Sequence, residues 1–186
     1  PSFGPTVIAR VLEAEGYRVA ILAQPDWHSA DAFLAMGRPR LGAMLCSGNL
    51  DSMVAHYTAA KKPRSEDFYS PGKKAGLRPD HAVIVYANRV REAFPGLPIV
   101  IGGLEASLRR FAHYDYWDDK VRRSALADAG ADILVYGMGE YASREIARRL
   151  KKKEPVASLI DIRGTAVLVN DPSVCAYPSV TLPSFE

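Results

Sequence analysis

Apolar and polar stretches alternate along this chain in a way that predicts strands and helices in turn. Short apolar runs without polar alternation predict buried strands over 41–46, 99–101 and 133–136, and 41–46 is expected to be buried on both faces. Apolar residues at helical spacing predict helices over 50–60, 80–94 and 140–150. Strands that alternate with helices indicate a mainly parallel sheet with helices on both faces.

The first forty residues predict a helix before any strand. Pro5 suits the first turn of a helix, and Gly16 suits its end. A strand over 17–22 and a short helix over 29–36 are expected to follow. Domains of this class usually open on a strand in the middle of the sheet. Either a first strand precedes Pro1, outside this chain, or the sheet is irregular, and the pattern favours the first.

The rest of the chain is less regular. Prolines and glycines without periodicity predict a long loop over 61–79. A helix is expected over 121–129, a strand over 164–169 and a linker over 177–186. The predicted organisation is a three-layer α/β/α domain over 1–155, followed by a strand and linker over 156–186.

Composition limits the class of protein. The 186 residues, of which 48% are hydrophobic, suffice for one domain with a real core. No apolar run approaches the roughly 20 residues that span a bilayer, and the first four residues do not resemble a signal peptide. Cys46 and Cys175 are the only cysteines. Two reduced thiols in a cytoplasmic protein are expected, with no membrane partner.

Charge adds one alternative. The net charge of +3 is small, but basic residues gather over 61–78 and 148–153. A solvated surface is the simpler interpretation. Contact with nucleic acid stays open, with the basic loop on phosphates and aromatic residues stacking on bases, but the small net charge does not favour it.

Two glycine-containing loops follow predicted strands, at the edge of a parallel sheet where ligands usually bind. The first opens a helix that Asn49 is expected to cap. The second contains a G-x-G pattern, which is a weak phosphate signal without a third glycine. Both loops are equally compatible with well-capped helices that bind nothing. The candidate contact residues in them are Ser47, Gly48, Asn49, Asp51, Gly137, Gly139 and Glu140.

The segment 98–120 is the richest in chemistry. It begins as a strand, breaks at a glycine pair that would let a ligand or another backbone approach, and continues into charged and aromatic residues. Either it contacts a ligand or a second domain, or it forms a lid of salt bridges satisfied within the chain. Its spacing does not indicate a metal site, and no catalytic residue is assigned. The candidate contact residues are Gly102, Gly103, Glu105, Arg109, Arg110, His113, Tyr114, Tyr116 and Trp117.

Several stretches together resemble the N-terminal region of the YgiQ-type radical SAM proteins. They are PSFG at the start, VLEAEGYRVAILAQPDW at 11–27, GNLDSMVAHYTAAKKPRS at 48–65, GGLEASLRRFAHYDYWDDKVRRS at 102–124, YGMGE at 136–140, RGTA at 163–166 and LPSFE at 182–186. The similarity covers essentially the whole chain.

The resemblance implies a Rossmann-like N-terminal domain, similar to cobalamin-binding-type domains, followed by a radical SAM barrel. In that barrel a C-x₃-C-x₂-C triad holds a 4Fe-4S cluster beside S-adenosylmethionine. This chain has no such triad, so the cluster and S-adenosylmethionine are implied only for a longer protein. Neither is assigned to a residue here, and no cofactor is expected in this part.

The main hypothesis is therefore an accessory domain that shapes or caps the substrate side of a downstream barrel and is inactive alone. The substrate is unknown. A binding module for a nucleotide-type or corrinoid-type ligand stays open as an alternative, although the chain has no D-x-H-x-x-G motif of cobalamin proteins. An RNA-contacting domain is the other alternative.

Overall fold

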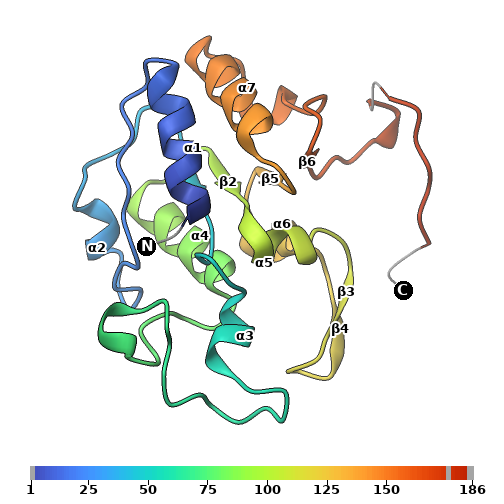
Figure 1. Cartoon of the computed structure of the whole chain (residues 1–186). Coiled ribbons are helices and arrows are strands. Elements are labelled where there is room, and N and C mark those ends of the chain that lie inside the picture. The colour runs from blue at the N-terminus through green and yellow to red at the C-terminus, as the bar shows by residue number, and fades with distance from the viewer. Residues whose placement is uncertain (1–2, 175–176, 184–186) are drawn as a thin grey trace.

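The computed structural model describes residues 3–174 and 177–183. Its main sheet, in the order β1-β2-β5-β6, is parallel between its first three strands, and β6 runs antiparallel to β5 (Figure 1). These strands are β1 (Ala43–Leu45), β2 (Ile99–Ile101), β5 (Ile133–Val135) and β6 (Thr165–Ala166). The prediction of an α/β fold with a mainly parallel sheet is confirmed.

Helices lie on both faces of this sheet. On one face, α1 (Phe3–Ala14) packs against α7 (Glu140–Lys151). On the other, α4 (Ala82–Ala93) packs against α2 (Asp31–Leu34) and α6 (Ala125–Ala129). The short helices α3 (Ser52–His56) and α5 (Gly103–Leu108) follow β1 and β2 at their carboxyl ends (Figure 1). Turns of 3₁₀ helix occupy Pro71–Lys73, Val156–Ser158 and Pro172–Val174.

The core explains why β2 and β5 form where the apolar runs predict them. Successive side chains of a strand point to opposite faces. Ile99 and Ile101 belong to the cluster formed with α4 and α6, whereas Val100 belongs to the cluster formed with α7. All three are at most 4% exposed. A central strand covered on both faces needs an unbroken apolar run, as these residues supply.

The prediction that the strand over 41–46 is buried on both faces is wrong. Among the described residues, strand β1 pairs only with β2, so it lies at an edge of the sheet, and Met44 is 39% exposed. An apolar run shows that a strand is hydrophobic, but it does not show where in the sheet the strand lies.

The predicted strand over 17–22 is also absent, since no regular structure occurs there. Ile21 and Leu22 are exposed instead, at 47% and 37%. A strand is defined by hydrogen bonds to a neighbour, and this segment has no paired neighbour among the described residues.

The prediction of one helix over 121–129 is wrong for its first part. The first part belongs to a hairpin of β3 (His113–Asp115) and β4 (Lys120–Arg122), in which Val121 pairs with Tyr114 and is 55% exposed. Helix α6 begins only after Ser124, whose hydroxyl accepts a hydrogen bond from the backbone N–H of Leu126 at 3.1 Å. The capping residue sets the start of the helix, and the apolar residue before it belongs to the hairpin.

Other boundaries are shorter than predicted. The helix expected over 50–60 ends at His56, and the strand expected over 164–169 is reduced to Thr165–Ala166. The loop over 61–79 contains a 3₁₀ turn and isolated β-bridges that pair Tyr57 with Pro63 and Glu66 with Lys74, and 177–183 has no regular structure. Cys175 and Ser184–Glu186 lie outside the described residues. Within the described ranges, no helix is both long and apolar enough to cross a membrane.

Candidate functional site

The three predicted loops meet at one edge of the sheet. Because β1, β2 and β5 are parallel, the chain leaves all three at the same end. The Gly102 N–H donates to the Leu45 carbonyl at 2.9 Å, and the Gly137 N–H donates to the Ser107 hydroxyl at 3.4 Å. A side chain at Gly103, whose φ is +79°, would meet Cys46 Cβ at 2.9 Å. The glycine pair therefore lets the loops after β1 and β2 approach closely.

Glu105 lies at the centre of these loops and is only 1% exposed. One carboxylate oxygen accepts from the Ser52 N–H at 2.8 Å, and the other accepts from the Val83 N–H at 3.0 Å. These donors belong to the first turns of α3 and α4, where free N–H groups and the helix dipole favour a negative charge. The Glu105 side chain thus ties two helices to the end of β2.

Asp51, not Asn49, caps α3. Its Oδ1 accepts from the backbone N–H groups of Met53 and Val54 at 3.0 and 3.2 Å. Its Oδ2 forms an ion pair with Arg109, whose side chain is 16% exposed. Burial lowers the pKa of Arg109. Asn49 has another role: its side-chain oxygen accepts from the Phe3 N–H at 2.9 Å, which fixes the start of α1 beside this loop.

A buried ion pair that the sequence did not indicate supports the same loop. Arg78 is 5% exposed, forms a 2.5 Å ion pair with Asp67 and donates to the Ser47 carbonyl at 3.2 Å. Burial would raise the pKa of Asp67, but hydrogen bonds from Ser70 and Arg78 outweigh it and hold that pKa below its usual range. Arg78 therefore does not belong to an exposed basic surface. The sequence feature that could have indicated its structural role is its position between Gly76 and Pro79, in a loop rich in glycine and proline.

The aromatic residues of the hairpin lie away from Glu105. The Tyr116 hydroxyl donates to the Ala59 carbonyl at 2.7 Å, and its ring lies 4.7 Å from the Lys61 ammonium. Trp117 contacts the Tyr57 ring edge-on, at 6.3 Å between centroids. His113 contacts the Phe111 carbonyl at 3.1 Å through Nδ1. Glu105, Arg109 and His113 thus do not form one open pocket.

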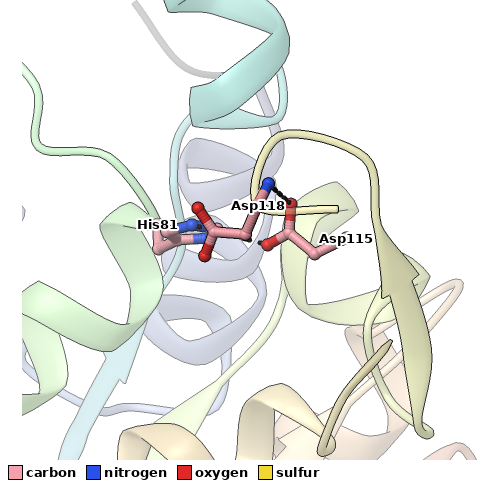
Figure 2. A group of neighbouring side chains, drawn as sticks. All are labelled: His81, Asp115 and Asp118. Atoms are coloured by element: carbon pink, nitrogen blue, oxygen red, sulfur yellow. Dashed lines mark hydrogen bonds and ion pairs between the residues drawn. The ribbon is translucent and has the colours of Figure 1, made fainter. Parts of the chain in front are cut away.

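One group of side chains has the composition of a metal site. Figure 2 shows His81, Asp115 and Asp118, whose ligand atoms lie within 4.8 Å of one another. The positive charges around them argue against a metal, however. Arg122 Nε lies 2.9 Å from Asp115 Oδ2, a second nitrogen of Arg122 contacts Asp118, and Lys120 lies 3.4 Å from Asp118.

Two carboxylates that already face two cations gain little from a further cation. The group is best described as an ion-pair cluster that joins the hairpin to α4. Sequence spacing could not reveal it, because His81 lies more than thirty residues before the two aspartates.

The residues present do not fit an iron–sulfur cluster. Such clusters are held mainly by several cysteine thiolates, and the chain contains only two cysteines, Cys46 and Cys175. No step of any reaction is therefore assigned to such a cluster in this chain.

Large apolar side chains remain exposed at the same edge. The loops after β2 and β5 lie side by side there, since Arg110 lies 5.0 Å from the Phe111 ring and 5.2 Å from the Tyr136 ring. We call this region the strand-end apolar surface. Its members are Leu104 (44% exposed), Leu108 (62%), Phe111 (53%), Met138 (84%) and Tyr141 (64%).

The residues at this edge therefore divide into two groups. Buried polar residues such as Glu105 and Asp51 bond within the chain and position the loops. The surface itself is formed by apolar neighbours that the sequence did not single out. Gly137 and Gly139 flank Met138, and Glu140 begins α7 beside Tyr141. The sequence feature that could have indicated this surface is Met138, an apolar residue between two glycines.

Comparison with known proteins identifies the family. The model of the family described as radical SAM N-terminal matches residues 1–186. The chain belongs to this family. A UPF0313 protein of Geobacter sulfurreducens is 55% identical over 186 residues, which are all of this chain and 31% of that protein. A UPF0313 protein of Clostridium botulinum (strain ATCC 19397 / Type A) is 53% identical and is covered to 29%.

A third relative supports the same family. The chain is 58% identical over 172 residues to a UPF0313 protein of Shewanella oneidensis, which covers 92% of the chain and 22% of that protein. The radical SAM N-terminal chain thus spans less than a third of these curated relatives. No solved structure matches it significantly.

Proposed function

We propose that this chain is an accessory domain of a radical SAM enzyme, which docks through its strand-end apolar surface onto the rest of the polypeptide. There it shapes or caps the substrate side of a barrel that carries the 4Fe-4S cluster and S-adenosylmethionine. The observation that carries this proposal is the exposure of Leu104, Leu108, Phe111, Met138 and Tyr141 at one edge. Contiguous exposed apolar surface commonly marks an interface.

Two further observations favour the rest of the same chain as the occupant. The relatives are more than three times as long as the matched region, so they contain further chain that needs a contact surface. The buried charges behind the surface, at Glu105, Asp51 and Arg109, are matched within the domain. They position a rigid platform and do not need a small ligand to neutralise them.

The proposal is tested by charged substitutions in the intact polypeptide. Leu108→Lys and Met138→Lys place ammonium groups in the proposed interface. We expect faster separation of this domain from the rest by a protease that cleaves after glutamate and therefore gains no site from these substitutions. Phe68→Lys is the matched control, because Phe68 is also exposed, at 72%, but lies in the 61–79 loop. Equal cleavage rates for all three variants and the wild type would reject the interface.

The assignment to radical SAM chemistry has its own test. After iron–sulfur reconstitution and reduction, the intact polypeptide should convert S-adenosylmethionine to 5′-deoxyadenosine, whereas the 186-residue chain should form none. Turnover by the 186-residue chain would show that the catalytic centre lies within it, contrary to the proposal.

We further propose that the fold is Rossmann-like and takes one more parallel strand, from chain before Pro1, at the free edge of β1. Two contacts support this. The Phe3 N–H bonds to Asn49, so α1 begins beside the carboxyl end of β1, where such a strand would end. Helix α1 then packs against α7, as a right-handed crossover from that strand toward 17–22 requires.

Cysteine pairs test this arrangement. Adjacent strands lie about 4.8 Å apart, so an intervening strand would separate Ile21 from Met44 by roughly 9–10 Å. Disulfides do not form beyond about 7 Å between Cα atoms. Ile21→Cys with Met44→Cys should therefore stay reduced in the intact polypeptide under mild oxidation. A cross-linked peptide pair in mass spectrometry would mean that 17–22 pairs directly with β1.

A further inference from the structure

A second feature lies beyond the carboxyl end of β1, apart from the strand-end apolar surface. A groove of about 580 Å³ runs between α3 and the 61–79 loop, and Trp27, His56, Tyr57, Arg64, Arg78 and Asp80 line it together with proline and valine side chains. Its volume is in the range of small-molecule sites. Arg78 ties the groove to the end of β1 through the Ser47 carbonyl, and ligands of open α/β sheets bind beyond such strand ends.

His56 is held in this groove by a carboxylate. Its Nδ1 lies 2.6 Å from Asp80 Oδ1, and the other oxygen of Asp80 accepts from the Tyr57 hydroxyl at 2.8 Å. The same hydrogen bond from Tyr57 raises the pKa of that phenol. A carboxylate beside Nδ1 places the imidazole proton on that nitrogen and leaves a lone pair on Nε2.

That Nε2 is a buried polar atom without a hydrogen-bond partner, on a side chain that is only 10% exposed. The indole N–H of Trp27, which also lines the groove, is buried and unpartnered as well. Buried polar atoms of native proteins are nearly always paired with protein, water or ligand. An acceptor and a donor left open in one groove therefore indicate a group that binds both.

Arg64 adds a positive charge at the rim. Its Nε donates to the carbonyls of Val54 and Tyr57, each at 3.1 Å, which fixes the guanidinium at the end of α3. The charge of Arg78, by contrast, is matched by Asp67. Arg64 is thus the guanidinium that can meet an anion, in a fork geometry that suits phosphate and carboxylate.

We propose that this groove binds an organic anion of nucleotide size that carries a hydroxyl group. The anionic group meets Arg64, the hydroxyl donates to His56 Nε2, and an oxygen accepts from the Trp27 indole N–H. This proposal stands on the groove alone and goes beyond the docking role, so either can fail without the other.

The test is calorimetric titration of the intact polypeptide with adenosine 5′-monophosphate as the probe. Adenosine lacks the anion and inorganic phosphate lacks the organic body, so each should bind at least tenfold more weakly. Arg64→Gln and Trp27→Phe should each weaken binding of the probe at least fivefold. Arg10→Gln, which changes an arginine that is 78% exposed on α1, should leave it unchanged.

A measurement on the wild-type protein keeps the test decisive if a variant fails to fold. Hydrogen exchange with and without the probe should show protection over 54–64 and 75–80. No heat at millimolar probe, or protection elsewhere only, would overturn the proposal. So would variants that bind as the wild type does, because the probe would then occupy another site.

Discussion

Replacing Glu105 by glutamine should destabilise the domain strongly, although the change is nearly isosteric. The carboxylate accepts two backbone N–H groups, from Ser52 and Val83, at a site that is 1% exposed. The amide turns an NH₂ group toward one of them. An unpaired buried donor costs about 1–3 kcal/mol, and a neutral hydrogen bond in place of a charged one costs about 1 kcal/mol more.

The free energy of unfolding should therefore fall by about 2–4 kcal/mol. For a domain of this size that lowers Tm by roughly 4–16 °C. Urea unfolding of the 186-residue chain, followed by circular dichroism, measures the loss, and an unchanged m-value shows that the unfolded state is the same. Glu140→Gln, at the start of α7, is the matched control and should cost only about 0.3–1 kcal/mol. A loss below about 0.5 kcal/mol for Glu105→Gln would refute the reasoning.

Three further changes test other parts of the structure. Asp67→Asn leaves the Arg78 charge buried without its partner and should cost about 3–5 kcal/mol in urea unfolding. Because the folded-state pKa of Asp67 lies below its usual value of 3.8, its stabilisation is present above about pH 4 and is lost on acidification. The Asn variant should lack that part of the acid dependence; an unchanged acid profile would contradict the pairing. Burial raises the pKa of Tyr86 to about 12, so stability should fall between pH 10 and pH 12 as unfolded Tyr86 ionises, and Tyr86→Phe should remove this loss. Arg122→Gln leaves Asp115 and Asp118 without their guanidinium and should raise the affinity of the cluster for Mn²⁺; unchanged calorimetric titrations would show that Arg122 does not exclude a cation.

The fold was predictable where an element is covered on both faces, because such an element requires an unbroken run of apolar residues in the sequence. Strands β2 and β5 and helices α4 and α7 lie close to their predicted ranges. Strand-forming residues over 17–22 have no paired neighbour in the part of the chain that the structure describes, and a strand is stabilised by such a neighbour as much as by its own residues. The hairpin of β3 and β4 was missed because Val121 sits on an exposed strand yet reads as part of an apolar helix face.

The site was predictable at the level of loops but not of contacts. Glycines after β1, β2 and β5 mark the three segments that meet: close approach requires Gly103, and positive φ angles favour glycine at Gly48 and Gly137. The partners of each charge come from distant positions: Asp67 pairs with Arg78, and Glu105 bonds to α3 and α4. The first pair depends on the path of the 61–79 loop and the second on the packing of α3 and α4, and local spacing encodes neither.

The central claim is that the strand-end apolar surface is an interface with the rest of the polypeptide. Hydrogen–deuterium exchange of the 186-residue chain and of the intact polypeptide, compared peptide by peptide, tests it most directly. We predict slower exchange in the intact polypeptide over 104–111 and 136–141, with no change over 61–70. Identical exchange over 104–111 and 136–141 in the two proteins would contradict the claim.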